Sequence, residues 1–310
     1  MLFVGACSVR ESRRESQVMV SSGKRAGRLL LVYVSVLVVM GLIAAAPLGY
    51  RTVISPGTTS PFSQPQGTSL NSETTVQSSP TLLPTTIPIG PIAGEQVLFG
   101  RSVDGQPLVY VRRGDPQGAR ILVIGSIHGD EDDGISIVDH LLDLEVPEGL
   151  ELWLVRSMNP DGNIAQTRQN ANGVDLNRNF PENWAPLEEL GNWQYSGPSA
   201  ASEPETQAMV SLGEEIRPHL VLWYHQDYFR ISPGRGVGGN IRRDYGQLTG
   251  LPILQVSGGT YTGTASQWSR SVTVQGGTGF TIELGPTLSD DEALTHAQAV
   301  LAVSEKYFVK

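Results

Sequence analysis

The stretch that decides the fold is RILVIGSIHGDEDDG, residues 120–134. Its first half, Arg120–Ser126, is a continuous apolar run that ends in glycine and serine, which is typical of a central strand covered on both faces. We expect a helix after it, with one apolar side. That side comprises Ile135, Val138, Leu141 and Leu142. Between strand and helix stand His128 and four acidic residues, which fit an ordinary charged turn as well as part of a metal site.

Further strand patterns alternate with helix patterns along the chain. A turn at Asp104-Gly105 separates the first two strands, and a second turn is expected at Asn159–Gly162, NPDG. The expected strands besides residues 120–126 are Glu95–Phe99, Leu108–Arg112, Leu150–Ser157, Leu220–Tyr224 and Gly279–Leu284.

Two later helices have recognisable starts. SEPE (Ser202–Glu205) is a capping-box pattern with proline early in the helix, and SDDE (Ser289–Glu292) opens the last helix. The residues expected to face the core are Met209, Leu212 and Ile216 in the first of these helices, and Leu294, Ala297, Leu301 and Phe308 in the second.

This alternation predicts an α/β fold, with a mixed, largely parallel central sheet and helices on both faces. In such sheets, ligands bind outside the carboxyl ends of the strands. His128, His225 and Glu283 all follow or end predicted strands. Three strands therefore bring polar groups to one edge of the sheet, which favours a functional site over a charged turn.

The N-terminal part differs in character from the rest. Residues 1–28 carry six basic residues and two acidic ones, and residues 29–46 (LLLVYVSVLVVMGLIAAA) carry no charge. We expect a basic cytoplasmic tail followed by a transmembrane anchor. A cleaved signal peptide is the alternative, although Pro47 would then follow the small residues at the cleavage site. Both interpretations place the body of the protein outside the cytoplasm, at the cell membrane or secreted.

A linker is predicted between the anchor and the folded body. Residues 52–94 contain seven prolines, nine threonines and seven serines, and such a segment cannot bury enough apolar surface to offset its chain entropy. We therefore assign residues 47–94 to a disordered linker and residues 95–310 to one catalytic domain, which we expect to be a monomer.

Charge and cysteine content exclude several classes of function. The formal net charge of the chain is −9 and its N-terminal tail is basic, so the body is acidic and poorly suited to bind nucleic acid. Cys7 is the one cysteine, which excludes an intrachain disulfide and a thiolate metal site. A transition metal would therefore need histidine and carboxylate ligands.

His128 and Glu131 lie three residues apart in the loop and can bind one metal ion together. A catalytic zinc needs a third protein ligand and a position left for water. Of the five histidines, His140 and His296 lie within predicted helices, where a solvated role is expected, and His219 belongs to a helix-to-strand turn. His225 remains as the third ligand, although a hydrogen-bonded histidine at a strand end is an alternative.

The segment NANGVDLNRNFPENW, residues 170–184, places Asp175, Asn177 and Arg178 within four residues. Asp175 can orient a ligand histidine through its outer ring nitrogen. Arg178 presents a planar fork that matches a carboxylate. A polar loop held by asparagine turns is the alternative, but it does not explain the arginine.

Together, these residues resemble the zinc metallocarboxypeptidase family (M14 type). The resemblance rests on His128-x-x-Glu131, on Asp175-x-Asn177-Arg178, on His225, and on Glu283 within TIELG. The stretches ANGVDLNRNFP and SEPETQA (Ser202–Ala208) are similar to the murein peptide amidase branch, which cleaves between γ-D-glutamate and diaminopimelate. The resemblance covers residues 95–310.

The resemblance implies a role for each matching residue. It implies that one Zn²⁺ is held by His128, Glu131 and His225, and that Glu283 is the general base. It further implies that Arg168 polarises the scissile carbonyl, that Asn177 and Arg178 bind the terminal carboxylate of the substrate, and that Asp175 supports His128. Tyr261 resembles the mobile tyrosine that closes over the substrate.

Some features depart from the family pattern. The branch is often cytoplasmic, whereas this chain carries an apolar segment and a linker, which favours cell-wall peptides outside the membrane. Ser266 stands where some members have an aspartate that selects basic residues. Asp227 is a further candidate, as a partner for the side-chain amine of diaminopimelate. The alternatives are a general metallocarboxypeptidase, a zinc deacylase of N-acyl amino acids, and a binding module without turnover.

Overall fold

The computed structural model describes residues 95–309. The predicted tail (1–28), anchor (29–46) and linker (47–94) lie outside the described residues. Within residues 95–309, no helix is both long and apolar enough to cross a membrane.

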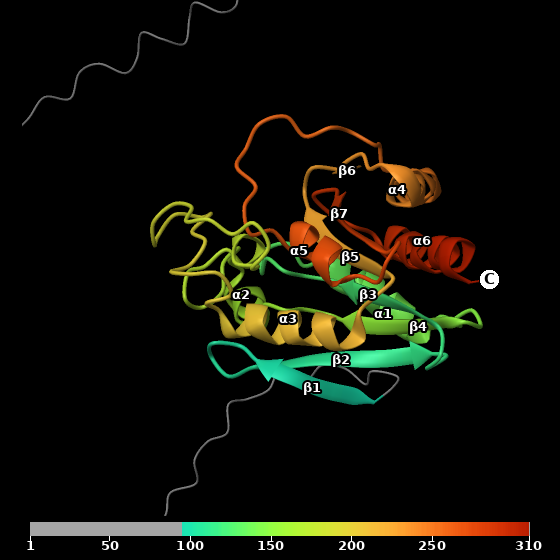
Figure 1. Cartoon of the computed structure of the whole chain (residues 1–310), viewed down its shortest axis with the longest axis horizontal. Coiled ribbons are helices and arrows are strands. Elements are labelled where there is room, and N and C mark those ends of the chain that lie inside the picture. Colours follow the sequence, from blue (N-terminus) through green and yellow to red (C-terminus); the bar gives the residue numbers. More distant parts are fainter. Residues whose placement is uncertain (1–94, 310) are drawn as a thin grey trace, which may run out of the picture. The chain divides into compact units, whose positions relative to one another are not determined.

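The described part of the chain has a seven-stranded sheet in the order β1-β2-β4-β3-β5-β7-β6 (Figure 1). The four central strands β4, β3, β5 and β7 are parallel to one another. On one side β2 pairs antiparallel with β4 and β1 pairs antiparallel with β2, and on the other side β6 pairs antiparallel with β7. The predicted mixed, largely parallel sheet is therefore confirmed. The strands are β1 Gln96–Arg101, β2 Pro107–Gly114, β3 Ala119–Ile124, β4 Leu150–Val155, β5 Leu220–Gln226, β6 Arg230–Ile231 and β7 Thr278–Leu284.

Helices cover both faces of this sheet, as predicted. The packing separates α1, α4 and α6 on one face from α3 and α5 on the other, each group sharing a hydrophobic cluster with the strands (Figure 1). The helices are α1 Gly134–Asp143, α2 Pro160–Ala165, α3 Pro204–Ile216, α4 Gly236–Thr249, α5 Ala265–Val272 and α6 Asp290–Phe308.

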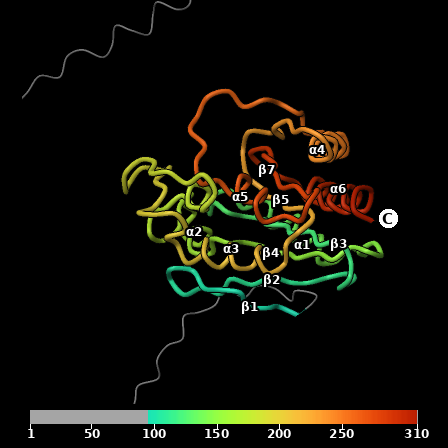
Figure 2. The backbone as a smooth tube through the Cα atoms, in the orientation of Figure 1, coloured from blue at the N-terminus to red at the C-terminus, as the bar shows by residue number. Residues whose placement is uncertain are grey.

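The alternation of side chains along β7 directs Glu283 away from one core. Phe280, Ile282 and Leu284 are buried in the cluster shared with α1, α4 and α6. Because side chains alternate along a strand, Thr281 and Glu283 face the opposite side. His225 and Glu283 are direct neighbours in the β5–β7 ladder, so both reach the carboxyl edge of the sheet. The segment between α4 and α5, orange in Figure 2, forms an arch that lies outside the sheet.

Three details of the predicted elements are wrong. Ile137, not Ile135, is among the buried residues of α1. The expected turn at Asn159–Gly162 is the start of α2, because the Asn159 side chain accepts a hydrogen bond from the Gly162 amide and Pro160 fits the first turn. The capping box at Ser202 is absent: Glu203 is the N-cap, without a side-chain cap bond. At the last helix, Ser289 and Glu292 do form a capping box.

His296 is buried rather than solvated, which corrects the prediction for this histidine. It is 4% exposed and its Nδ1 lies 2.8 Å from the Tyr245 hydroxyl. Tyr245 in turn lies 2.8 Å from the Tyr224 hydroxyl. Burial lowers the pKa of His296 to about 4, so the folded protein holds a neutral imidazole there.

This burial predicts a pH dependence of stability. The unfolded chain takes up a proton on His296 below about pH 6.5, whereas the folded chain does so only near pH 4. The free energy of unfolding should therefore fall by about 3 kcal/mol between these two pH values. In His296→Asn, urea unfolding across this range should show a decline smaller by about that amount, and His140→Asn should keep the wild-type decline. An unchanged decline in His296→Asn would contradict the assignment.

Candidate metal centre and active site

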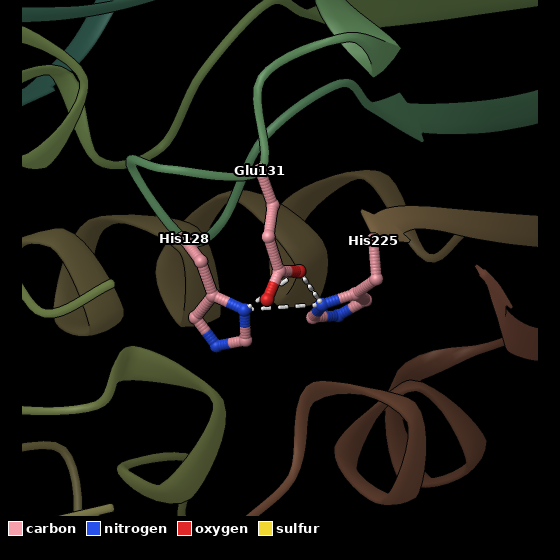
Figure 3. Close-up of side chains that lie close together, drawn as sticks. All are labelled: His128, Glu131 and His225. Atoms are coloured by element: carbon pink, nitrogen blue, oxygen red, sulfur yellow. Dashed lines mark hydrogen bonds and ion pairs between the residues drawn. The ribbon is translucent and has the colours of Figure 1, made fainter. Parts of the chain in front are cut away.

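Three side chains from two segments meet at the carboxyl edge of the sheet. His128 and Glu131 belong to the loop after β3, and His225 lies near the end of β5. The Glu131 Oε2 atom lies 3.0 Å from His128 Nδ1 and 2.9 Å from His225 Nδ1, and the two ring nitrogens are 3.2 Å apart. Figure 3 shows the three groups pointing towards one another. The predicted metal ligands are thus brought together.

The outer ring nitrogens of both histidines face polar side chains of the loop around η1, a short 3₁₀ helix at Leu176–Arg178. His128 Nε2 lies 3.0 Å from Asp175 Oδ1, and His225 Nε2 lies 3.3 Å from Asn177 Nδ2. A carboxylate at Nε2 favours the tautomer with its proton there, which leaves the Nδ1 lone pair facing inwards. Asp175 therefore lies where it can orient the ring of His128.

Asp175 is fully buried yet stays ionised. Burial raises the pKa of its carboxyl group, but His128 and Arg168 outweigh that effect and bring the pKa well below the usual range. The pKa of Glu131 is lowered in the same way, because the effect of the two histidines outweighs that of burial. The site therefore offers two negative charges beside the ring nitrogens, which suits a divalent cation.

The donor set fits a zinc ion. Two imidazole nitrogens and one carboxylate oxygen lie within 4.8 Å of one another, and zinc accepts this combination in catalytic sites. Both histidines are buried, at 1% and 3% exposure, while all three side chains also line an open pocket. The pocket side leaves room for a fourth group, which is the arrangement of a catalytic rather than a structural site.

Arg168 lies beside the metal ligands. Its guanidinium donates to Glu131 Oε1 at 2.9 Å and to Asp175 Oδ2 at 2.9 and 3.1 Å, and it contacts His128 Nδ1 at 3.0 Å. The Trp193 ring covers it at 5.0 Å. The structure thus brings the predicted carbonyl-polarising residue to the centre of the site, while its fork spans two carboxylates.

Glu283 lines the same pocket, which has a volume of about 390 Å³. Burial raises the pKa of its carboxyl group, and the Glu131 charge adds to this, against the opposing effect of His225. Its Oε2 atom has no hydrogen-bond partner among the described residues. A half-buried carboxylate with a raised pKa and a free oxygen is suited to accept a proton.

Arg178 and Tyr261 lie together on another wall of the pocket. Arg178 is 4% exposed, and its Nη1 donates to the Asn177 carbonyl at 2.8 Å, while its Nε has no partner among the described residues. Its guanidinium lies 5.5 Å from the Tyr261 ring centre. Asn177 Oδ1 accepts from the Ala265 amide at 2.9 Å, which joins this loop to the start of α5.

The structure adds residues that the sequence reasoning missed and removes one that it proposed. Arg230, Arg242 and Arg270 also line the pocket, and no short motif pointed to them. Ser266 lines it as well. Asp227 is exposed and is not part of the lining, so the structure does not support it as a partner for a substrate amine.

Known proteins are similar to this chain in sequence and in fold. A model of the zinc carboxypeptidase family (peptidase M14) matches residues 91–228. Murein peptide amidase A from Vibrio campbellii is 30% identical over 217 residues, covering 66% of this chain and 85% of the relative. The protein of the same name from Escherichia coli K12 is 31% identical over 206 residues, covering 63% and 83%.

Solved structures agree with these matches. The crystal structure of the murein-tripeptide amidase from Escherichia coli O157 superposes with a TM-score of 0.56 at 28% identity, covering 69% of this chain and 93% of that one. Carboxypeptidase A from Helicoverpa armigera shares the fold, with a TM-score of 0.59 at 19% identity, covering 70% and 68%. With its His-Glu-His group, the chain therefore belongs to the zinc carboxypeptidase family and is a zinc metallopeptidase.

Proposed function

We propose that the protein hydrolyses the amide bond next to the terminal residue of cell-wall peptides, with the bond between γ-D-glutamate and diaminopimelate as its substrate bond. The observation that carries this proposal is the meeting of three groups in one pocket: the His128–Glu131–His225 set, the free carboxylate of Glu283 and the guanidinium of Arg178. The murein peptide amidases among the relatives support the choice of substrate.

The chemistry is divided between the metal and the chain. A zinc ion held by His128, Glu131 and His225 would lower the pKa of a bound water to about 7 and would polarise a carbonyl group. Glu283 takes the proton of the attacking water and passes it to the leaving amine, because its raised pKa makes it both a competent base and a competent acid. Arg168 lies where its guanidinium can also stabilise negative charge on the carbonyl oxygen.

Arg178 defines which bond is cleaved. Its fork can bind a free carboxylate through two parallel hydrogen bonds, and Asn177 beside it lines the same pocket. A substrate anchored there presents the amide next to its terminal residue to Glu283. Such a site selects peptides that end in a carboxylate beside the scissile bond.

Location follows from the N-terminal sequence and is part of the proposal. The apolar segment 29–46 and the linker 47–94 would hold the domain outside the cytoplasmic membrane, where cell-wall peptides occur. The enzyme would then act on external wall peptides as an anchored protein.

The test compares L-Ala-γ-D-Glu-meso-diaminopimelate with the same peptide amidated at the carboxylate next to the scissile bond. The charge-assisted bonds to Arg178 should make the free peptide better by about 10- to 150-fold in kcat/KM. In Arg178→Lys this ratio should shrink because the planar fork is lost, while Arg243→Lys, on the exposed side of α4, should keep it.

Two outcomes would overturn the proposal. Equal rates on the free and amidated peptides would exclude Arg178 as a carboxylate-binding residue. Cleavage of ordinary α-linked peptides without cleavage of the γ-D-glutamyl peptide would instead indicate a general carboxypeptidase.

A further inference from the structure

The pocket is strongly basic although the protein is acidic. Five arginines line it, against the two carboxylates of Glu131 and Glu283, in a chain with a formal net charge of −9. A pocket lined by one sign of charge attracts ligands of the opposite sign. Arg168 and Arg178 already have roles at the scissile bond, so the others need an explanation. These are Arg230, Arg242 and Arg270.

None of these three arginines forms an ion pair with a carboxylate of residues 95–309. The Nε atoms of Arg230 and Arg242 are also buried without a hydrogen-bond partner there. Charged groups that are partly removed from water are normally paired, so arginines without a carboxylate partner in a pocket wall point to an anionic ligand. Arg230 lies over the Tyr228 ring and opposite Glu283 in the β6–β7 ladder, which places it at the reaction centre.

Arg242 is held in place at some distance from that centre. Its Nη2 donates to the Gly279 carbonyl at 3.2 Å, and its guanidinium lies 4.7 Å from the Phe280 ring centre. Gly234 leaves the space for this guanidinium, because a Cβ atom there would lie 1.9 Å from Arg242 Nη1. The arginine is thus packed and oriented, not a loose surface side chain.

Arg270 is brought to the same place by α5. The preceding Ser269 packs on Gly279, where a Cβ atom would lie 2.3 Å from the Ser269 Cβ, and the Ser269 hydroxyl accepts a hydrogen bond from Trp223 Nε1 at 2.8 Å. Both arginines therefore approach the pocket around Gly279. Burial, together with the charge of Arg270, lowers the pKa of Arg242 to about 10, so Arg242 remains charged at neutral pH.

The contact with Gly279 separates this pair from Glu283 along β7. Gly279 lies four residues before Glu283 on β7, which corresponds to roughly 13 Å along a strand. We therefore expect a group that contacts the pair to lie away from the scissile amide. It belongs to the side chain of the substrate residue and not to its main chain.

We propose that Arg242 and Arg270 form a second anion subsite, which selects a released residue carrying a carboxylate on its side chain. This inference rests on the proposed function for the identity of that residue: diaminopimelate has such a distal carboxylate, and glutamate in an ordinary peptide is the other source of the same chemistry. Arg178 then binds the carboxylate next to the scissile bond, and the arginine pair binds the distal one.

The experiment uses a matched pair of substrates. L-Ala-γ-D-Glu-2-aminopimelate and its distal carboxamide differ only in the charge at the far end of the side chain. The zinc-loaded protein should cleave the free acid with a kcat/KM about 10- to 150-fold higher. In Arg242→Gln/Arg270→Gln this ratio should fall below about threefold, while the carboxamide is still cleaved. Arg243→Gln, next to Arg242 but outside the pocket, should keep the wild-type ratio.

Two results would overturn the subsite. One is a wild-type protein that cleaves the free acid and the carboxamide equally well, and the other is a double variant that keeps the wild-type preference for the free acid. If the double variant does not fold, Arg270→Gln alone gives the answer, because this side chain is exposed. A second substrate series of N-acylated α-linked dipeptides ending in Glu or Gln separates this inference from the proposed function. A preference for Glu without any γ-D-glutamyl cleavage supports the subsite and refutes the murein substrate. Cleavage of γ-D-glutamyl peptides without an acidic preference supports the murein substrate and refutes the subsite.

Discussion

Glu283→Gln should lower turnover by about 10²–10⁴-fold, the range typical of a positioned proton-transfer group. The amide keeps the shape of the side chain but cannot take a proton from water. Burial and the Glu131 charge raise the pKa of the Glu283 carboxyl group, and Glu283 lines the pocket together with the three clustered ligands. Steady-state kinetics on the γ-D-glutamyl tripeptide would measure the loss.

The control for this variant separates catalysis from metal binding. Glu283→Gln should bind zinc with wild-type stoichiometry, since Glu283 is not one of the three clustered ligands. Glu305→Gln, an exposed carboxylate on α6, should leave turnover unchanged. Near-normal turnover in Glu283→Gln would mean that another group serves as the base.

His225→Ala should remove most of the bound zinc, because two ligands on one loop remain of the three. The variant should also lose activity, and metal analysis of the purified protein would measure the zinc content. His140→Ala is the matched control, since this imidazole lies on α1 and pairs with Asp290 at 2.8 Å. Wild-type zinc in His225→Ala would refute the ligand assignment.

His219 is not a substitute for His225. It precedes β5, and its Nδ1 accepts from the Arg120 amide at 3.0 Å at the opposite end of that strand. Six residues along a strand correspond to roughly 20 Å, which places His219 far from His128 and Glu131. The position at the carboxyl end of β5 is what brings His225 to His128 and Glu131.

The strands and their functional ends could be predicted because their signals are local. The apolar runs at Arg120–Ser126, Leu220–Tyr224 and Gly279–Leu284 are short and continuous, and the residues that follow or end them meet at one edge for topological reasons. His128 and His225 therefore came together as expected.

The arginine pair of the pocket could not be predicted in this way. Arg242 lies on α4 and Arg270 on α5, and neither helix was among the expected elements. Their meeting depends on tertiary packing at Gly279, which Arg242 contacts from α4 and Ser269 contacts from α5. No local periodic pattern in the sequence predicts such a contact.

His296 shows a signal that was present but overlooked. It lies on the same helical stripe as Ala293, Ala297 and Val300, all of which are buried. The spacing of three and four residues marks the inward side of a helix, and it outweighs the polar character of the imidazole. The hydroxyl of Tyr245 then provides the hydrogen-bond partner that makes burial possible.

The most direct test of the central claim is mass spectrometry of L-Ala-γ-D-Glu-meso-diaminopimelate after incubation with the zinc-loaded protein in ¹⁸O-labelled water. The expected products are free diaminopimelate and L-Ala-D-Glu that carries one ¹⁸O atom in its γ-carboxylate, and removal of zinc by a chelator should abolish both. An intact tripeptide, or release of alanine in place of diaminopimelate, would contradict the central claim.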